Sequence, residues 1–350
     1  MVYIGTYTQQ LPHVNGIAEG IYVCGFDRQT GQLSIQSIAK GVINPSFMTL
    51  SPDGHCLYAV QELDAGLVSA FAVDPTTGDL TLLNSQPSGG AHPCYVSVTA
   101  DGRWLLVANY TGATVSALAI GGDGHLSAPA LTLKHTGTPT HHDGPHPHAI
   151  VPMPDRRYVL VPDCGLDRVY VYRLGDTEAV LKAQQPAWLQ LAPGSGPRHL
   201  ALHNNGQIVY CINERNSTLT TLAYDAQHGQ LQALQTLSTL PEQSSVANSC
   251  ADIHVHPSGR WLYGSNRGHD SIAIFTIDAQ TGLLELRGHA PTAGRTPRNF
   301  ALDSDGEWLL AANQDSSTIV SFRIDTSTGM LSQEYVNEVR TPVCVLMNNG

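Results

Sequence analysis

The stretch FMTLSPDGHCLYAV, residues 47–60, places an Asp-Gly pair between two short apolar runs. Asp-Gly and Asn-Gly pairs accept positive φ and favour tight hairpins between twisted strands. The same pattern returns at residues 95–108, 149–162, 200–213, 253–266 and 300–313. Its turns fall at Asp53-Gly54, Asp101-Gly102, Asp155-Arg156, Asn205-Gly206, Ser258-Gly259 and Asp305-Gly306, which are 47 to 54 residues apart. Such regular spacing indicates one supersecondary unit repeated along the chain.

Each repeat has two further strands after the hairpin. A third apolar run follows, as at residues 68–74 and 272–278, and a glycine-centred turn usually leads to a weaker fourth run. Helical periodicity is absent throughout. Four short antiparallel strands with a period near 50 residues are typical of a β-propeller blade. The sequence therefore predicts an all-β propeller of four-stranded blades.

The two ends of the chain supply the last blade. Residues 341–350 contain one strand and a turn, while residues 2–8, 21–27 and 33–39 supply three strands. Six whole blades and one blade shared by the N- and C-terminal strands make seven. This arrangement closes the ring without leaving exposed sheet edges. We expect residues 1–350 to form a single seven-bladed domain.

Composition excludes several classes of partner. Hydrophobic residues make up 42% of the chain, and the formal net charge is -11. An acidic protein is a poor ligand for nucleic acid or for an anionic membrane. The sequence has no apolar run long enough to span a bilayer and no signal segment at its start. The seven cysteines are scattered without a C-x-x-C pair, which favours a cytoplasmic location. Oligomeric state cannot be read from the sequence.

Polar residues gather where the inner strands of the blades begin and end. In an up-and-down meander, the start of the first strand and the end of the second lie on the face opposite the turn between them. The strand starts carry His146, His148, Arg198, His199 and Arg298, and the strand ends carry Glu62, Asn109, Asp163, Glu214, Arg267 and Asn313. We expect these side chains to converge on one mouth of the central channel.

Convergent acids, arginines and histidines in a concave region predict an active site. The expected substrate-binding residues are His148, His199, Arg298, Asn266 and Asp163. The segment HHDGPHPH, residues 141–148, has His135 and His92 near it in sequence or in repeat position, but none of the usual zinc-ligand spacings occurs. We therefore expect neither a metal nor a cofactor.

Three segments carry a family resemblance: GPRHLALH with YCINERNSTLTTL, ADIHVHPSGRWLYGSNRGHDSIAIF, and GRTPRNFALDSDGEWLLAANQDSSTIVSF. They resemble the seven-bladed propeller lactonase family, which includes bacterial propeller-type 6-phosphogluconolactonases and the fungal carboxy-muconate cyclase. The resemblance covers nearly the whole chain and is most specific between residues 145 and 322.

The resemblance implies that the catalytic residues are Glu214, His146, Arg198 and Arg267. Glu214 matches the family's proposed acid/base carboxylate, and Arg198 and Arg267 match its two arginines at the mouth. His146 matches the family's histidine, with His148 as the rival, because GPHPHA carries two candidates. Cys164, in PDCGLD, stands where an apolar residue is usual.

The expected function is hydrolysis of a sugar-acid lactone, with 6-phosphogluconolactone converted to 6-phosphogluconate. The partner is then a small-molecule sugar lactone. One alternative is a lactonase for an unphosphorylated aldonolactone, and another is a muconate-type lactonising cycloisomerase that uses the same groups without water. A non-enzymatic interaction propeller is a third, although the G-H…W-D signature of WD40 repeats is absent.

Overall fold

The computed structural model describes residues 1–139, 144–175 and 180–348. The chain divides into two compact units. Unit 1 comprises residues 1–40, 199–223 and 233–350, and unit 2 comprises residues 41–198 and 224–232. In the described part of the chain, the strands form seven four-stranded antiparallel sheets and one separate hairpin. This is the architecture of a seven-bladed β-propeller, as the repeat predicts.

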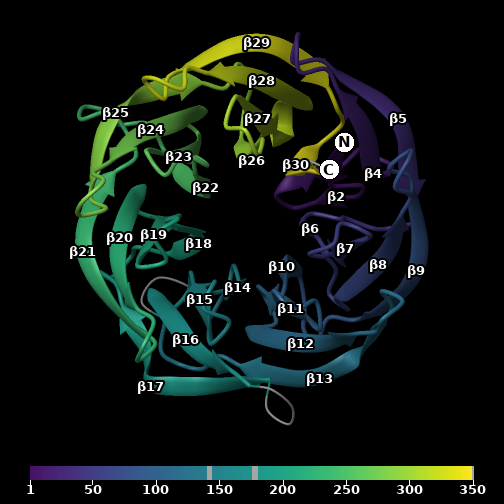
Figure 1. Ribbon diagram of the computed structural model, residues 1–350, viewed down its shortest axis with the longest axis horizontal. Coiled ribbons are helices and arrows are strands. Elements are labelled where there is room, and N and C mark those ends of the chain that lie inside the picture. The colour runs from purple at the N-terminus through teal and green to yellow at the C-terminus, as the bar shows by residue number, and fades with distance from the viewer. Residues whose placement is uncertain (140–143, 176–179, 349–350) are drawn as a thin grey trace. The chain divides into compact units, whose positions relative to one another are not determined.

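Strands of consecutive sequence pair within each sheet (Figure 1). The sheets that lie wholly in unit 2 are formed by β6 (Met48–Leu50), β7 (Cys56–Gln61), β8 (Leu67–Val73) and β9 (Leu80–Pro87); by β10 (Pro93–Val98), β11 (Trp104–Asn109), β12 (Thr114–Ile120) and β13 (Leu126–Lys134); and by β14 (Val151–Pro152), β15 (Tyr158–Asp163), β16 (Arg168–Leu174) and β17 (Leu181–Gln190).

Unit 1 holds the sheets β22 (Ser249–Val255), β23 (Trp261–Arg267), β24 (Ser271–Ile277) and β25 (Leu284–Pro291), and β26 (Pro297–Leu302), β27 (Trp308–Asn313), β28 (Thr318–Ile324) and β29 (Leu331–Glu338). A further sheet consists of β18 (Pro197–Leu202), β19 (Ile208–Asn213), β20 (Thr218–Asp225) and β21 (Gln230–Ser238). Within the described ranges, helical structure is limited to one 3-10 turn, η1 (Gln314–Ser316).

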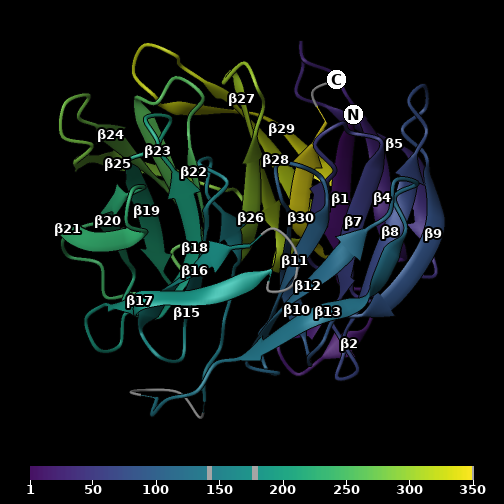
Figure 2. The same ribbon diagram turned by 60° about the horizontal axis from the view of Figure 1, so that its bottom comes forward.

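The terminal strands share one sheet, as predicted. Its order is β30 (Pro342–Met347), β1 (Val2–Thr6), β4 (Gly20–Phe26) and β5 (Leu33–Lys40). Val2 pairs with Met347 and Ile4 with Val345, and the N-terminal ammonium donates to the carbonyl of Asn348. Figures 1 and 2 both show the N- and C-termini side by side in this sheet. A strand from each end therefore completes the same hydrogen-bonded ladder.

The turns between the first two strands of each sheet have the expected backbone. Gly54, Gly206 and Gly306 take φ values of 74°, 68° and 70°. Each glycine amide donates to the carbonyl three residues before it, as from Gly54 to Ser51. Arg156 occupies the same position in β14–β15 and takes φ 59°, although a Cβ is disfavoured there. The hairpin is thus retained where the glycine is missing.

The turns between the third and fourth strands are held by an aspartate and a neighbouring sheet. Asp325 accepts hydrogen bonds from the amides of Ser327 and Thr328, and Gly329 follows at φ 75°. The carbonyl of Gly329 accepts a 2.9 Å bond from the hydroxyl of Tyr263, which lies on the second strand of the preceding sheet. Tyr210 contacts the carbonyl of Gly282 in the same way at 2.8 Å. These bonds tie the turns at Gly282 and Gly329 to the preceding sheet.

The hydrophobic core lies between successive sheets. In unit 1, Tyr263 and Ile274 of one sheet pack with Leu309 and Phe322 of the next. In unit 2, Tyr58 and Val68 pack with Leu105 and similar residues of the following sheet. Because both faces of these strands are buried, their sequences read as continuous apolar runs.

One small element is absent from the sequence-based expectation. The loop between β1 and β4 contains a hairpin of β2 (Gln10–Leu11) and β3 (Val14–Asn15), which lies at the lower edge of Figure 2. Tyr7, Val14 and Val343 form a small apolar cluster beneath it. Among the described residues, no helix has the length and apolar character needed to cross a bilayer.

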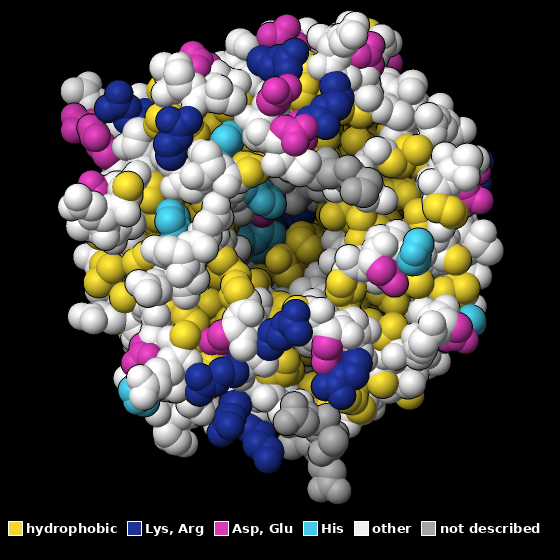
Figure 3. Space-filling view, in the orientation of Figure 1, with side chains coloured by type: hydrophobic (Ala, Val, Ile, Leu, Met, Phe, Trp, Pro, Cys, Tyr) yellow, Lys and Arg dark blue, Asp and Glu magenta, His cyan; other side chains and the backbone are white. Residues whose placement is uncertain are grey.

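A basic surface region lies at the turn end of one sheet. Figure 3 shows lysine and arginine side chains gathered at the lower edge of the face it draws, over β15 and β16. Exposed arginines on these strands and on the turn before β15 include Arg156, Arg157 and Arg173. They lie at the opposite end of β15 from Asp163, so this region is separate from the predicted site residues of that sheet.

Candidate active site

In six sheets a buried polar residue of the second strand pairs with the first residue of the third strand, and we call this the brace position. Its members are Gln61, Asn109, Asp163, Asn213, Asn266 and Asn313. The asparagines bond within the protein: Nδ2 of Asn266 donates to the carbonyl of Thr239 at 2.9 Å, and Nδ2 of Asn313 donates to that of Thr292 at 2.9 Å. The brace side chains therefore hold the loops between sheets.

The next residue in each sheet occupies what we call the rim position. Its members are Glu62, Tyr110, Cys164, Glu214, Arg267 and Gln314. The predicted strand-end residues fall at two successive positions, because Asn109, Asp163 and Asn313 align with Asn213 and not with Glu214. A step of one residue along a strand turns a side chain to the other face. The candidate groups are consequently the rim residues.

Glu214 and Arg267 form an ion pair between two rim positions of unit 1. Nη2 of Arg267 lies 3.2 Å from Oε2 of Glu214, and the two side chains are 14% and 22% exposed, respectively. Arg267 Nη2 also donates to the carbonyl of Cys250 at 2.9 Å, and the Cys250 amide donates to the Glu214 carbonyl at 3.1 Å. The carboxylate is thus fixed beside a cation while part of it still meets solvent.

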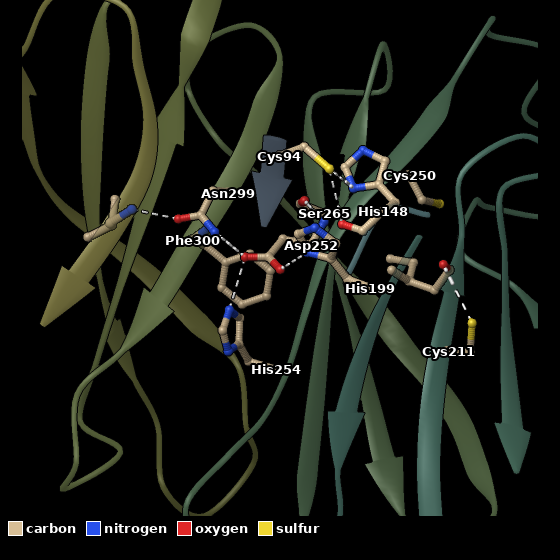
Figure 4. A network of polar contacts seen from close by, with 12 residues as sticks. Cys94, His148, His199, Cys211, Cys250, Asp252, His254, Ser265, Asn299 and Phe300 are labelled. Carbon is tan, nitrogen blue, oxygen red and sulfur yellow. Dashed lines mark hydrogen bonds and ion pairs between the residues drawn. The ribbon is translucent and has the colours of Figure 1, made fainter. Parts of the chain in front are cut away.

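A second charged group in unit 1, Asp252 on β22, is almost fully buried (Figure 4). Its Oδ1 accepts from Nδ1 of His199 at 2.7 Å. Its Oδ2 accepts from Nε2 of His254 at 3.0 Å and from Nδ2 of Asn299 at 2.5 Å. Asp252 is not among the predicted site residues, because it lies inside the apolar strand CADIHV and no sequence pattern marks it. The contact explains where His199, a predicted substrate-binding residue, points.

The protonation of this cluster follows from its contacts. Burial alone would raise the pKa of Asp252, but the charge of His254 and the hydrogen bond from His199 hold it well below its ordinary value. Burial likewise opposes the charged form of His254, yet the Asp252 carboxylate raises the pKa of that imidazole. Asp252 is therefore an anion that orients two imidazoles.

The residue after a proline at the start of a first strand forms another repeated position. Pro93 pairs with Asn109, Pro147 with Asp163, and Pro297 with Asn313. The residues that follow are Cys94, His148 and Arg298, and Arg198 follows Pro197 in β18. By register His148, rather than His146, is equivalent to the arginines. Arg298 is held with its guanidinium carbon 5.6 Å from the ring centre of Tyr7.

In unit 2, two histidines flank Tyr110. The His146 ring stacks on Tyr110 with centroids 4.2 Å apart, and its Nδ1 lies 3.0 Å from the Tyr110 carbonyl oxygen. A carbonyl oxygen only accepts, so Nδ1 of His146 donates in this contact. His148 meets the edge of Tyr110, and its Nδ1 lies 3.8 Å from Sγ of Cys94.

The remaining predicted residues are deeply buried. Arg198 is 2% exposed. Asp163 and Asn266 are fully buried, and their side chains bond to other groups of the protein. Ser46 and Glu62 form a 2.5 Å contact that the sequence did not suggest. Contact of Arg198, Asp163 and Asn266 with a substrate stays a prediction.

The described residues contain no group of three or more His, Cys, Asp or Glu arranged to hold a metal ion. His141, His142 and Asp143 of the histidine-rich segment lie outside the described residues. His135, named beside that segment, is bound to Asp163 and Tyr172.

The comparisons with known proteins identify the class. Residues 1–347 match the family model "Lactonase, 7-bladed beta-propeller", and the chain belongs to this family. It is 33% identical over 304 residues to a 6-phosphogluconolactonase of Bacillus subtilis, covering 86% of this chain and 84% of the relative. A 6-phosphogluconolactonase of Formosa agariphila is 35% identical over 311 residues, covering 86% of each chain.

Among solved structures, a periplasmic gluconolactonase of Pseudomonas aeruginosa is 30% identical and superposes with a TM-score of 0.92. That similarity covers 99% of this chain and 98% of the other. The fold and the family named by the sequence resemblance are confirmed.

Proposed function

We propose that this protein is a lactonase that hydrolyses 6-phosphogluconolactone to 6-phosphogluconate. The observation that carries the proposal is the Glu214–Arg267 pair, a solvent-reachable carboxylate fixed 3.2 Å from a guanidinium in a chain of the propeller lactonase family. The names of the relatives from Bacillus subtilis and Formosa agariphila supply the substrate.

The reaction needs a base, a site for the oxyanion and a proton for the leaving oxygen. Glu214 takes a proton from water, whose oxygen attacks the lactone carbonyl carbon. General-base catalysis of this kind contributes about 10²–10⁴ in rate. The protonated Glu214 then delivers that proton to the ring oxygen as the C–O bond breaks. No further reactant is required.

The arginines stabilise negative charge. Arg267 donates to the oxygen that becomes negative in the tetrahedral intermediate, and loss of one such donor costs roughly 10²–10³ in kcat. Arg298, which lies in unit 1 with Glu214 and Arg267, binds the phosphate, because a guanidinium matches its oxygens with paired hydrogen bonds. His146 accepts a substrate hydroxyl at Nε2, and His148 lines the same part of unit 2.

A second substrate follows from one comparison. The solved gluconolactonase from Pseudomonas aeruginosa, 30% identical, favours an unphosphorylated aldonolactone as the alternative. In that case Arg298 contacts hydroxyls instead of a phosphate.

The test is hydrolysis of freshly prepared lactones by purified protein in the presence of EDTA. We expect acceleration over buffer with 6-phosphogluconolactone, and a higher KM with glucono-δ-lactone because the phosphate contacts are lost. A higher kcat/KM for the unphosphorylated lactone would transfer the proposal to the alternative. No acceleration with either lactone would overturn both.

A further inference from the structure

The brace position of four sheets is filled by a neutral asparagine. Nδ2 of Asn109 donates to the carbonyl of Ser88 at 3.1 Å, and Asn266 and Asn313 make the same bond to their preceding loops. Oδ1 of Asn266 also accepts from the Thr239 hydroxyl at 2.8 Å, but within the described ranges the buried Oδ1 atoms of Asn109 and Asn313 have no hydrogen-bond partner. In these two sheets the brace works with its donor alone.

The sheet β14–β17 departs from this pattern because its brace is Asp163. A carboxylate has no N–H to donate. His135 is the equivalent here of Ser88, because each residue directly follows the fourth strand of its sheet. The amide of each donates to a carbonyl in the loop between the second and third strands of that same sheet. Nδ1 of His135 donates to Oδ2 of Asp163 at 2.6 Å, and its Nε2 lies 2.9 Å from the Tyr172 hydroxyl. The brace residue is therefore the acceptor here and the loop residue is the donor, the reverse of the Asn109–Ser88 contact.

The other oxygen of Asp163 accepts hydrogen bonds, whereas Oδ1 of Asn109 and Asn313 accepts none within the described ranges. Oδ1 accepts three backbone amides, from His146 at 2.8 Å, Gly165 at 3.0 Å and Leu166 at 3.1 Å. The carboxylate thus anchors the backbone of His146, while the His146 ring is held separately by Tyr110. One side chain links the loop before the first strand to the loop after the second.

Fold stability gives no reason for this exchange. Asp163 is fully buried and the His135 side chain is 1% exposed, and a buried ionisable pair is seldom more stable than a neutral replacement of similar shape. Four other sheets of this protein fold with asparagine at the same position. A carboxylate does, however, make stronger hydrogen bonds to N–H groups than a neutral amide does.

We propose that Asp163, oriented by His135, is a positioning residue that fixes His146 for contact with the substrate. Asp163 then acts through the His146 backbone, rather than by touching the substrate as the sequence analysis expected. The inference rests on the proposed function, because His146 is one of the groups assigned to the lactone.

The test compares three variants in kcat, KM and Tm. Asp163→Asn keeps the shape but replaces the anion. His135→Ser combined with Asp163→Asn reproduces the neutral Ser88–Asn109 pairing found in another sheet of this protein. Gln61→Ala is the control, since it removes a brace from the sheet β6–β9, to which no substrate contact is assigned.

We expect kcat to fall about 10- to 100-fold in both Asp163 variants, since a displacement of ~1 Å at a reacting group costs on the order of 100-fold. The double variant should recover the Tm of the parent without recovering kcat, and Gln61→Ala should lose Tm but keep kcat. A double variant with the parent's kcat would overturn the proposal. An equal loss of kcat in Gln61→Ala would also overturn it, because the effect would then be structural.

A second measurement does not depend on activity. Amide hydrogen exchange at His146 should become faster in both Asp163 variants and remain unchanged in Gln61→Ala. Unchanged exchange in the Asp163 variants would refute the anchoring. If the parent protein hydrolyses no lactone, the proposed function fails and the exchange data still decide whether Asp163 holds His146.

Discussion

Replacing Arg267 by glutamine tests whether the ion pair controls the base. The guanidinium contacts Oε2 of Glu214 at 3.2 Å and the carbonyl of Cys250 at 2.9 Å, and glutamine removes the charge while keeping a donor. Because the cation favours the charged carboxylate, Glu214 becomes easier to protonate without it. The base is then lost at a higher pH, and the acid limb of the pH–rate profile moves upward.

The structure sets the size of this shift. A hydrogen bond to a charged group contributes about 1.5–3 kcal/mol. Since the two side chains are 14% and 22% exposed, solvent screens part of the interaction, and we take the lower end of that range. At roughly 1.36 kcal/mol per pH unit, the acid limb should rise by about 1 unit. Loss of the oxyanion contact should also lower kcat about 100-fold.

The assay is kcat/KM for 6-phosphogluconolactone against pH, which reports the free enzyme. Arg287→Gln is the matched control, because Arg287 pairs with Glu285 at 3.5 Å on the exposed surface. Its profile should match that of the parent. If the acid limb of Arg267→Gln does not move, Glu214 and Arg267 are not coupled, and the reasoning that makes Glu214 the base is refuted. His146 then becomes the better candidate.

Three further predictions concern the fold. Tyr263→Phe removes the 2.9 Å bond to the Gly329 carbonyl and should lower the free energy of unfolding by about 1 kcal/mol, with a lower Tm. Arg156→Gly relieves a non-glycine residue at φ 59° and should raise the free energy of unfolding by about 0.5–1 kcal/mol, measured as a higher denaturant midpoint at unchanged m, whereas a lower midpoint would contradict the strain. Hydrogen bonds from the Ser327 side chain and amide lower the pKa of Asp325 from 3.8 to about 2, so its contribution is present above pH ~4 and lost as the pH falls towards 2. In Asp325→Asn the Tm should therefore change less between pH ~4 and ~2 than in the parent. An equal change of Tm with pH in the two proteins would exclude Asp325 as a source of this pH dependence.

The sequence predicts the sheets well because their signals are local. An Asp-Gly or Asn-Gly pair between apolar runs specifies a hairpin by backbone conformation alone, and even Asp155-Arg156 retains it. The hairpin β2–β3 was not predicted, since its two-residue strands are too short to show a periodic pattern.

The site was predicted less completely for a physical reason. Strands buried on both faces do not alternate, so their sequences do not show which residue is the last to point inward. The sequence therefore does not show which of Asn213 and Glu214 is buried, although the first is a brace and the second lies at the rim. Asp252 was missed for the same cause, because its partners His199 and Asn299 come from other strands.

The most direct test of the central claim is the kcat/KM of Glu214→Gln for 6-phosphogluconolactone, measured with EDTA present. Glu242→Gln, a change at an exposed glutamate, is the control. If Glu214 accepts the proton of the attacking water, kcat/KM should fall by about 10²–10⁴ while Tm and the control remain at parent values. A Glu214→Gln protein that stays within about three-fold of the parent would contradict the assignment of Glu214 as the base.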